Sequence, residues 1–164
     1  MGKKAPTDRS QSGPGPRARE QDRAEVRLGS WDEFGAQACR IRFAVFVAEQ
    51  GVAPELEIDA TDPQSLHALA SRSTGPALGT GRLLPDGHIG RIAVVREARG
   101  QGVGAALLLK LMEAARQQGH QEVELFSQVH AQRFYERFGF VVVGPPFDDA
   151  GIAHVTMRCK LSAG

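Results

Sequence analysis

The residues of this chain best suited to bind a ligand are an arginine and three alternating glycines, in the string Arg99-Gly100-Gln101-Gly102-Val103-Gly104. They follow an apolar run, 89–95, and precede a stretch of helical periodicity, 105–118. Glycine has no Cβ, so the backbone can turn tightly there and a ligand can approach it closely. The first amides of a helix lack intrahelical acceptors and lie at the positive end of the helix dipole. The string therefore predicts a cradle for a phosphate or pyrophosphate, although glycines at this spacing also occur in plain turns.

The known phosphate-binding motifs narrow the choice of ligand. A P-loop requires Gly-x-x-x-x-Gly-Lys-Ser/Thr, which this sequence does not contain. The dinucleotide fingerprint requires Gly-x-Gly-x-x-Gly early in a βαβ unit, with an acid about twenty residues later. Glu122 and Glu124 fit that distance, but the glycine spacing differs and the loop lies past the middle of the chain. The pattern therefore favours a pyrophosphate ligand of another kind.

Two strings in this order resemble the GCN5-related N-acetyltransferases (GNAT). Ile92-Ala93-Val94 with the glycine loop resembles the family's acyl-CoA motif, Arg/Gln-x-x-Gly-x-Gly/Ala, and residues 134–140 (FYERFGF) resemble the helix and strand that follow it. Residues 46–50 (FVAEQ) and 55–59 (ELEID) resemble the ElaA-type bacterial branch. The resemblance covers residues 25–161. It implies that acetyl-CoA is the co-substrate and that its acetyl group passes directly to a primary amine of a small molecule or peptide in a ternary complex.

The resemblance also implies roles for individual residues. The strand at 92–94 would pair its backbone with the pantetheine amides, and an amide near Val94 would polarise the thioester carbonyl. Tyr135, the only tyrosine in the chain, would donate a hydrogen bond to the departing sulfur, since a phenol with a pKa near ~10 is protonated at neutral pH. The cofactor-binding residues predicted in this way are Ile92, Ala93, Val94, Arg99, Gly100, Gln101, Gly102, Val103, Gly104, Ala105 and Tyr135.

The general base is left open by the sequence. The side chains that qualify by type, though none by spacing, are Glu49, Glu57, Asp59, His67 and His154, and a chain of water molecules is an alternative. Glu49, at the end of an apolar helical pattern, is the catalytic candidate that we single out. In the family this region borders the acceptor entrance, so Glu57, Asp59 and His154 are predicted to contact the acceptor amine. The alternative for them is a solvated acidic loop and a hydrogen-bonded strand histidine.

Length and composition indicate one globular domain, with 41% hydrophobic residues in 164. Residues 1–24 carry six basic and three acidic side chains without apolar periodicity, and we expect a disordered basic tail ahead of an acyltransferase domain at 25–164. The remaining 14 basic and 16 acidic side chains give no electrostatic case for nucleic acid. No apolar run approaches the roughly twenty residues of a membrane span. Two cysteines without Cys/His spacing predict no metal site and a reduced, cytoplasmic protein.

Periodicity predicts strands and helices in one chain, an α/β (α+β) fold. The resemblance implies a single GNAT-like domain, with a central mixed, mostly antiparallel sheet of about six or seven strands flanked by about four helices. The expected strands are 25–29, 65–72, 77–84, 88–95, 122–128, 140–143 and 153–161. The expected helices include 31–50, with Ser30 and Glu33 as a capping box, 105–118 and 131–138. The resemblance also admits a homodimer.

Two other functions stay open at this stage. The first is a non-catalytic acyl-CoA-binding module with a sensing or regulatory role, which would keep the glycine loop without turnover. The second is a nucleotide-binding oxidoreductase, which the loop spacing and the short chain disfavour.

Overall fold

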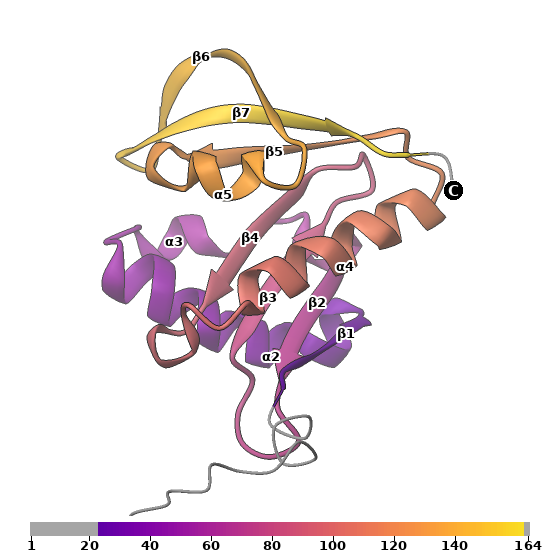
Figure 1. The fold of residues 1–164 in the computed structure, drawn as a ribbon. Helices are drawn as coiled ribbons and strands as arrows, with labels where there is room; N and C mark the ends of the chain where they lie inside the picture. The colour runs from indigo at the N-terminus through magenta and orange to yellow at the C-terminus, as the bar shows by residue number, and fades with distance from the viewer. Residues whose placement is uncertain (1–22, 163–164) are drawn as a thin grey trace, which may run out of the picture.

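The computed structural model describes residues 23–162, so residues 1–22 of the predicted tail lie outside the described part of the chain. Within it, seven strands form two antiparallel sheets (Figure 1). The strand order of the first sheet is β1 (Glu25–Gly29), β2 (Leu66–Ser71), β3 (Gly79–Leu83) and β4 (Ile89–Val94). The order of the second sheet is β5 (Glu122–Gln128), β7 (Ile152–Lys160) and β6 (Val141–Asp149). The predicted fold class is confirmed.

The α-helices of the described residues are α2 (Trp31–Arg42), α3 (Pro54–Glu57), α4 (Val103–Gln117) and α5 (Gln132–Glu136). Three short 3₁₀ turns are η2 (Asp62–Gln64), η3 (Arg96–Ala98) and η4 (Val129–Ala131). The predicted capping box begins α2: the Glu33 amide donates to the Ser30 hydroxyl, and the Ser30 amide donates to the Glu33 carboxylate. None of these helices is long and apolar enough to cross a membrane.

The prediction of one α-helix over 31–50 is wrong in its second half. From Phe43 to Glu49 the chain forms a π-helix, η1, in which the Gln50 amide donates to the Val45 carbonyl five residues back. A π-helix turn contains more residues than an α-turn, so the apolar stripe rotates away from the core. Phe43, the first residue of η1, is 41% exposed. Glu49, the predicted catalytic residue, is the last residue of η1.

The first sheet is covered by α2 on one face and α4 on the other. Alternate residues of β2 show this division, since Ala68 and Ala70 pack with Leu107 and Leu111 of α4 while Leu69 packs with the α2 side. Two glycines of β3 let α4 approach closely: a Cβ on Gly79 would lie 2.9 Å from Leu107, and one on Gly81 would lie 2.9 Å from Leu111. These close contacts fix the position of α4, and with it the glycine loop at its amino end.

The last hairpin is longer than predicted, because β6 continues to Asp149 rather than ending at Val143. Pairing with β7 is interrupted between Val143 and Phe147, and it resumes with Phe147 opposite His154. Pro145 and Pro146 lie in this interruption, where the absence of a backbone N–H costs no ladder hydrogen bond. The prolines therefore mark a bulge and not the end of the strand.

Candidate active site

The two sheets meet at β4 and β5, which run parallel but pair only at one end. A single bridge joins His88 to Glu124, where the Glu124 amide lies 3.3 Å from the Gly87 carbonyl. Further along, β4 pairs only with β3 and β5 only with β7 among the described residues. The strands therefore diverge from the bridge toward Val94 and Gln128, and we call the space between these two ends the β4–β5 gap (Figure 1).

The backbone of Val94 points into this gap. The Val95 amide donates to the Leu78 carbonyl, next to β3, at 2.9 Å. Since successive residues of a strand direct their N–H and C=O groups to opposite sides, those of Ile92 and Val94 point away from β3. Those of Ala93 point toward β3, where Ala93 is paired with Thr80. Ile92 and Val94 thus present backbone groups to a ligand, whereas for Ala93 the predicted cofactor contact stays a prediction.

The predicted phosphate loop lies just beyond this edge and is open. Gly100 and Gly102 have φ angles of +74° and +82°, and no atom lies within 4 Å of the position of a Cβ on either. Gly102 is the N-cap of α4, and the first amide to reach an intrahelical carbonyl is that of Ala106, which donates to Gly102 at 3.0 Å. The amides of Val103, Gly104 and Ala105 are therefore available for an anion. The side chain of Gln101 instead donates to the Glu97 carbonyl.

Arg99 contacts two other predicted site residues at the start of this loop. Its Nη2 lies 2.7 Å from Glu49 Oε2, and its Nε donates to the Val94 carbonyl at 3.1 Å. Both side chains are partly exposed, at 42% for Arg99 and 23% for Glu49. The structure thus brings Glu49, Val94 and Arg99 together at the end of β4. A phosphate bound by the loop would compete with Glu49 for the Arg99 guanidinium.

Tyr135 lies on α5, which packs against the same helix start. A Cβ on Gly104 would lie 3.7 Å from the Phe134 ring and 3.8 Å from Val94, so β4, α4 and α5 converge at Gly104. Tyr135 contacts Phe134 and Phe140 edge to face, at centroid distances of 5.1 and 6.0 Å. Burial raises the pKa of its hydroxyl to about 12. Among the described residues, no hydrogen bond to this hydroxyl is found, which leaves it able to donate to a ligand.

The far side of the gap is formed by the end of β5 and the adjacent β7. Gln128 Nε2 donates to Gln50 Oε1 at 2.8 Å, which links β5 to the residue after Glu49. His154, paired with Gln128 across the β5–β7 ladder, is buried and stacks on Phe147 at 5.9 Å. Its Nδ1 donates to the Ile152 carbonyl at 2.7 Å, so the neutral ring has Nε2 as an acceptor. His154 therefore qualifies chemically as a base, and its contact with an acceptor stays a prediction.

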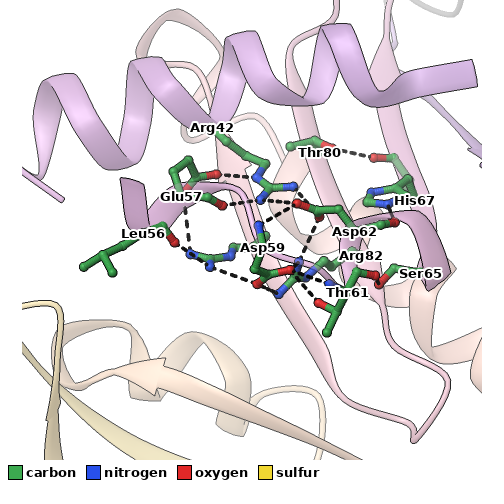
Figure 2. Close-up of polar contacts among 12 residues, drawn as sticks. Arg42, Leu56, Glu57, Asp59, Thr61, Asp62, Ser65, His67, Thr80 and Arg82 are labelled. Carbon is green, nitrogen blue, oxygen red and sulfur yellow. Dashed lines mark hydrogen bonds and ion pairs between the residues drawn. The ribbon is translucent and has the colours of Figure 1, made fainter. Parts of the chain in front are cut away.

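The acidic segment before β2 has a different environment from the one we expected. Its carboxylates pair with guanidinium groups, in what we call the ion-pair cluster: Arg42, Glu57, Asp59, Asp62, Arg82 and Arg91. Figure 2 shows the carboxylates facing Arg42 and Arg82. Glu57 and Asp62 are fully buried, and Arg42 pairs with both. Hydrogen bonds from Arg82 hold the pKa of Asp59 well below its ordinary range. The acids are neutralised within the protein, so the geometry gives no support to acceptor binding by Glu57 or Asp59.

His67 belongs to this framework as well. Its Nε2 donates to the Asp62 carbonyl at 2.9 Å, its ring lies 4.9 Å from Trp31, and it is 1% exposed. Burial lowers the pKa of this imidazole. A fully buried ring that already donates to a backbone carbonyl has no route to an acceptor amine, which leaves Glu49 and His154 as the better-placed bases.

Sequence reasoning missed four contributors to the site. Phe134 supports Gly104, Gln50 and Gln128 connect the two sides of the gap, and Arg91 belongs to the ion-pair cluster. Phe134 could have been found from its place beside Tyr135 on the α5 stripe. The other contacts join residues far apart in the sequence, and no local pattern indicates them.

Comparisons with known proteins identify the family of this chain. The family described as "Acetyltransferase (GNAT) domain" matches residues 32–161. Protein ElaA of Escherichia coli is 32% identical over 127 residues, which cover 72% of this chain and 82% of ElaA. Its crystal structure superposes with a TM-score of 0.75 at 28% identity, covering 83% of this chain and 99% of ElaA. An acyl-CoA N-acyltransferase from Pseudomonas aeruginosa superposes with a TM-score of 0.73 at 31% identity, covering 83% and 99%. This chain belongs to the GNAT acetyltransferase family and resembles its ElaA-type branch.

Proposed function

We propose that the protein is an acetyl-CoA-dependent N-acetyltransferase that transfers the acetyl group directly to a primary amine of a small molecule or peptide. The observation that carries this proposal is the β4–β5 gap, where the backbone of Ile92 and Val94 lies open beside the glycine loop. A strand edge without a partner binds an extended chain bearing amides, and free amides at a helix start bind phosphates. Acetyl-CoA contains both kinds of group, because its pantetheine arm is an extended chain with amides and its pyrophosphate is an anion. The acyl-CoA N-acyltransferase relative from P. aeruginosa supports the same donor.

The residues around the gap fit the donor without rearrangement of the fold. The left-handed Gly100 and Gly102 leave space above the amides of 103–105, which would bind the pyrophosphate. The backbone of Ile92 and Val94 would pair with the pantetheine amides. Arg99, now bonded to the Val94 carbonyl and to Glu49, would turn to the phosphates. In the bound state the Glu49 carboxylate would lose its ion-pair partner and become available to the acceptor amine.

The thioester supplies the activated acyl group, and the residues of the chain handle the charges and protons. Glu49 or His154 takes one proton from the acceptor ammonium, so that the neutral nitrogen can attack the carbonyl carbon. The Val94 amide donates to the carbonyl oxygen, where negative charge develops. Tyr135 donates to the sulfur as the carbon–sulfur bond breaks. The nitrogen loses its second proton as the amide forms, and this proton leaves with the thiol.

Tyr135 acts here as a hydrogen-bond donor and not as the source of the proton. Its pKa of about 12 lies well above that of a thiol, about 8.5, so full transfer of its proton to the thiolate would be uphill by roughly 5 kcal/mol. A hydrogen bond to the developing thiolate requires no transfer and is strengthened by the negative charge. The hydroxyl therefore stabilises the leaving group at every pH at which the protein is folded and the phenol protonated.

Turnover by the purified full-length chain tests this function. The protein is incubated with acetyl-CoA and a panel of primary amines that includes arylalkylamines, lysine and peptides with free amino termini. We expect release of the CoA thiol in step with an amine product heavier by one acetyl group, and neither without protein. Binding of acetyl-CoA without turnover of any amine would instead favour the non-catalytic module. Absence of both binding and turnover would refute the proposal.

A further inference from the structure

Arg91 has a backbone conformation that is unusual for its side chain. Its φ angle is +52°, one of two positive values among the non-glycine residues of the described chain. It lies in β4 at an irregularity of the β3–β4 ladder, where Arg82 pairs with Gly90 and Thr80 pairs with Ala93. Arg91 and Ile92 together therefore oppose the single residue Gly81. This is a β-bulge whose first residue is left-handed, a position that glycine commonly occupies.

The bulge decides which backbone groups of β4 face the gap. In a regular strand, residues at odd separations point in opposite directions. Ile89 and Ile92, three residues apart, nevertheless both pack on the α4 side, and Ala93 packs on the α2 side. The extra residue thus reverses the alternation after Arg91. Without the bulge the N–H of Val94 would point toward β3, and that of Ala93 would point into the gap.

The Arg91 side chain is held by the ion-pair cluster. Its Nη2 donates to the Leu56 carbonyl at 3.2 Å and lies 3.4 Å from Asp59 Oδ2, and its Nη1 lies 3.5 Å from Glu57 Oε2. Glu57 and Asp59 are held in turn by Arg42 and Arg82, from α2 and β3. A long side chain with fixed partners can hold the left-handed conformation that its own Cβ disfavours.

We propose that Arg91 is a positioning residue for acyl transfer, whose attachment to Leu56, Glu57 and Asp59 holds the bulge that directs the Ile92 and Val94 backbone into the β4–β5 gap. That acetyl-CoA binds the Ile92 and Val94 backbone rests on the proposed function, whereas the attachment of Arg91 to the cluster does not. Arg91 contacts no reacting atom in this scheme. The cluster that the sequence presents as an acidic acceptor site instead sets the geometry of the donor site.

Three variants of the full chain separate this role from other roles of the arginine. Arg91→Met keeps an unbranched apolar stem but removes the guanidinium and its partners, with the left-handed cost unchanged. Arg91→Gly also removes the partners but adopts a positive φ without cost. Arg158→Met removes an exposed ion pair with Glu124 on β5 and is the matched control. Acetyl-CoA affinity is measured by calorimetry, and KM for acetyl-CoA and kcat are measured separately.

We expect Arg91→Met to raise the Kd for acetyl-CoA about tenfold. The apparent Kd rises in this way when the fraction of molecules in the binding-competent conformation falls to about a tenth. Arg91→Gly and Arg158→Met should stay within about threefold of the native protein, a shift of well under one decade. Native affinity in Arg91→Met would overturn the proposal. Equal losses in Arg91→Met and Arg91→Gly would also overturn it, because they would show that Arg91 acts through its charge on the cofactor.

Hydrogen exchange tests the attachment without any ligand. The amides of Ala93 and Val95 face β3 because of the bulge. In Arg91→Met they should exchange about tenfold faster than in the native protein, whereas Arg91→Gly and Arg158→Met should match the native rate. Unchanged exchange in Arg91→Met would refute the attachment even if the native protein binds acetyl-CoA. Faster exchange in Arg91→Met, together with a native protein that binds no acetyl-CoA, would refute the proposed function but not the attachment.

Discussion

The two sides of β4 deal with polar groups in opposite ways. On the α2 side, the ion-pair cluster gathers three arginines and three acids, and Arg42, Glu57 and Asp62 are at most 1% exposed. Toward β5, the backbone of Ile92 and Val94 and the amides that begin α4 have no strand or helix partner. The charged side chains of the cluster are thus paired within the protein, whereas the backbone N–H groups of Ile92 and Val94 are left open.

This difference shows where binding capacity lies in the molecule. Charged side chains suggest a site from the sequence, but a buried carboxylate with two arginine partners has little attraction left for a ligand. An unpaired backbone N–H group cannot be identified from the residue type, yet it is a strong hydrogen-bond donor for a ligand. The charged cluster belongs to the framework, and the uncharged strand edge is the part that we propose as the site.

The largest effect on stability is expected from the cluster. Arg42→Met would leave the buried carboxylates of Glu57 and Asp62 without their main partner, at a cost of about 3–5 kcal/mol. The melting temperature should fall by about 10 °C. Arg116→Met, which breaks the exposed pair with Glu113 on α4, is the control and should melt like the native protein. Equal melting of both variants would contradict the structural role of the cluster.

Changes to the β4 backbone that faces the β4–β5 gap should have the opposite effect, a loss of activity at little cost in stability. Val94→Pro removes an N–H that faces the gap, and kcat should fall by about 10²–10³, as when an oxyanion-hole donor is lost. Val95→Pro removes the N–H that donates to Leu78, so it should lower the melting temperature instead. Differential scanning calorimetry and steady-state rates of the two variants separate the N–H that faces the gap from the N–H that faces β3. The same phenotype in both would refute the assignment of the Val94 amide.

Tyr135→Phe should have a smaller effect on the rate. Loss of a hydrogen bond to a charged group is worth about 2 kcal/mol, or roughly 30-fold in kcat, with the fold intact. The raised pKa adds a pH test. Since the protonated phenol is the active form, the native rate should show no loss attributable to Tyr135 until the pH rises toward about 12. An alkaline limb near pH 9 that disappears in Tyr135→Phe would show that the phenol titrates in the site.

The smallest effect concerns acid stability. The pKa of Asp59 is lowered in the folded protein by hydrogen bonds from Arg82, so its ionised form stabilises the fold above the unfolded pKa of about 3.9. This contribution should disappear as the pH falls below about 4 toward the lowered folded value. Urea denaturation between these limits should give a shallower pH dependence for Asp59→Asn than for the native protein. An unchanged slope would mean that Asp59 is not paired in solution.

Much of the fold could be predicted from local pattern. Ser30 and Glu33 identified the first helix start, and the alternation in 122–128 identified β5. The loop from Arg99 to Gly104 was recognisable because its left-handed positions are occupied by glycine, which is visible in the sequence. The π-helix over 43–49 was not, since its apolar spacing also fits an α-helix.

The ion-pair cluster could not be predicted because its members are far apart in the chain. Arg42 and Asp62 are 20 residues apart, and Arg91 and Glu57 are 34 apart. From the sequence alone, the acids therefore looked unpaired and suited to bind a cation. The bulge was also hidden, since the left-handed position is occupied by Arg91 and not by glycine. Because arginines distant in the sequence pair with these acids, the segment predicted to bind the acceptor amine instead forms the ion-pair cluster next to the β4–β5 gap.

Binding of acetyl-CoA to the native protein and to Gly102→Glu is the most direct test of the gap as the donor site. Gly102 has a φ of +82° at an open position, so glutamate there places a carboxylate beside the phosphate amides at a backbone cost of about 1–2 kcal/mol. By isothermal calorimetry, the native protein should bind one acetyl-CoA per chain. Gly102→Glu should bind at least about a hundredfold more weakly while still melting cooperatively, a loss of about 2.7 kcal/mol. Native affinity in Gly102→Glu, or no binding by the native protein, would contradict the assignment.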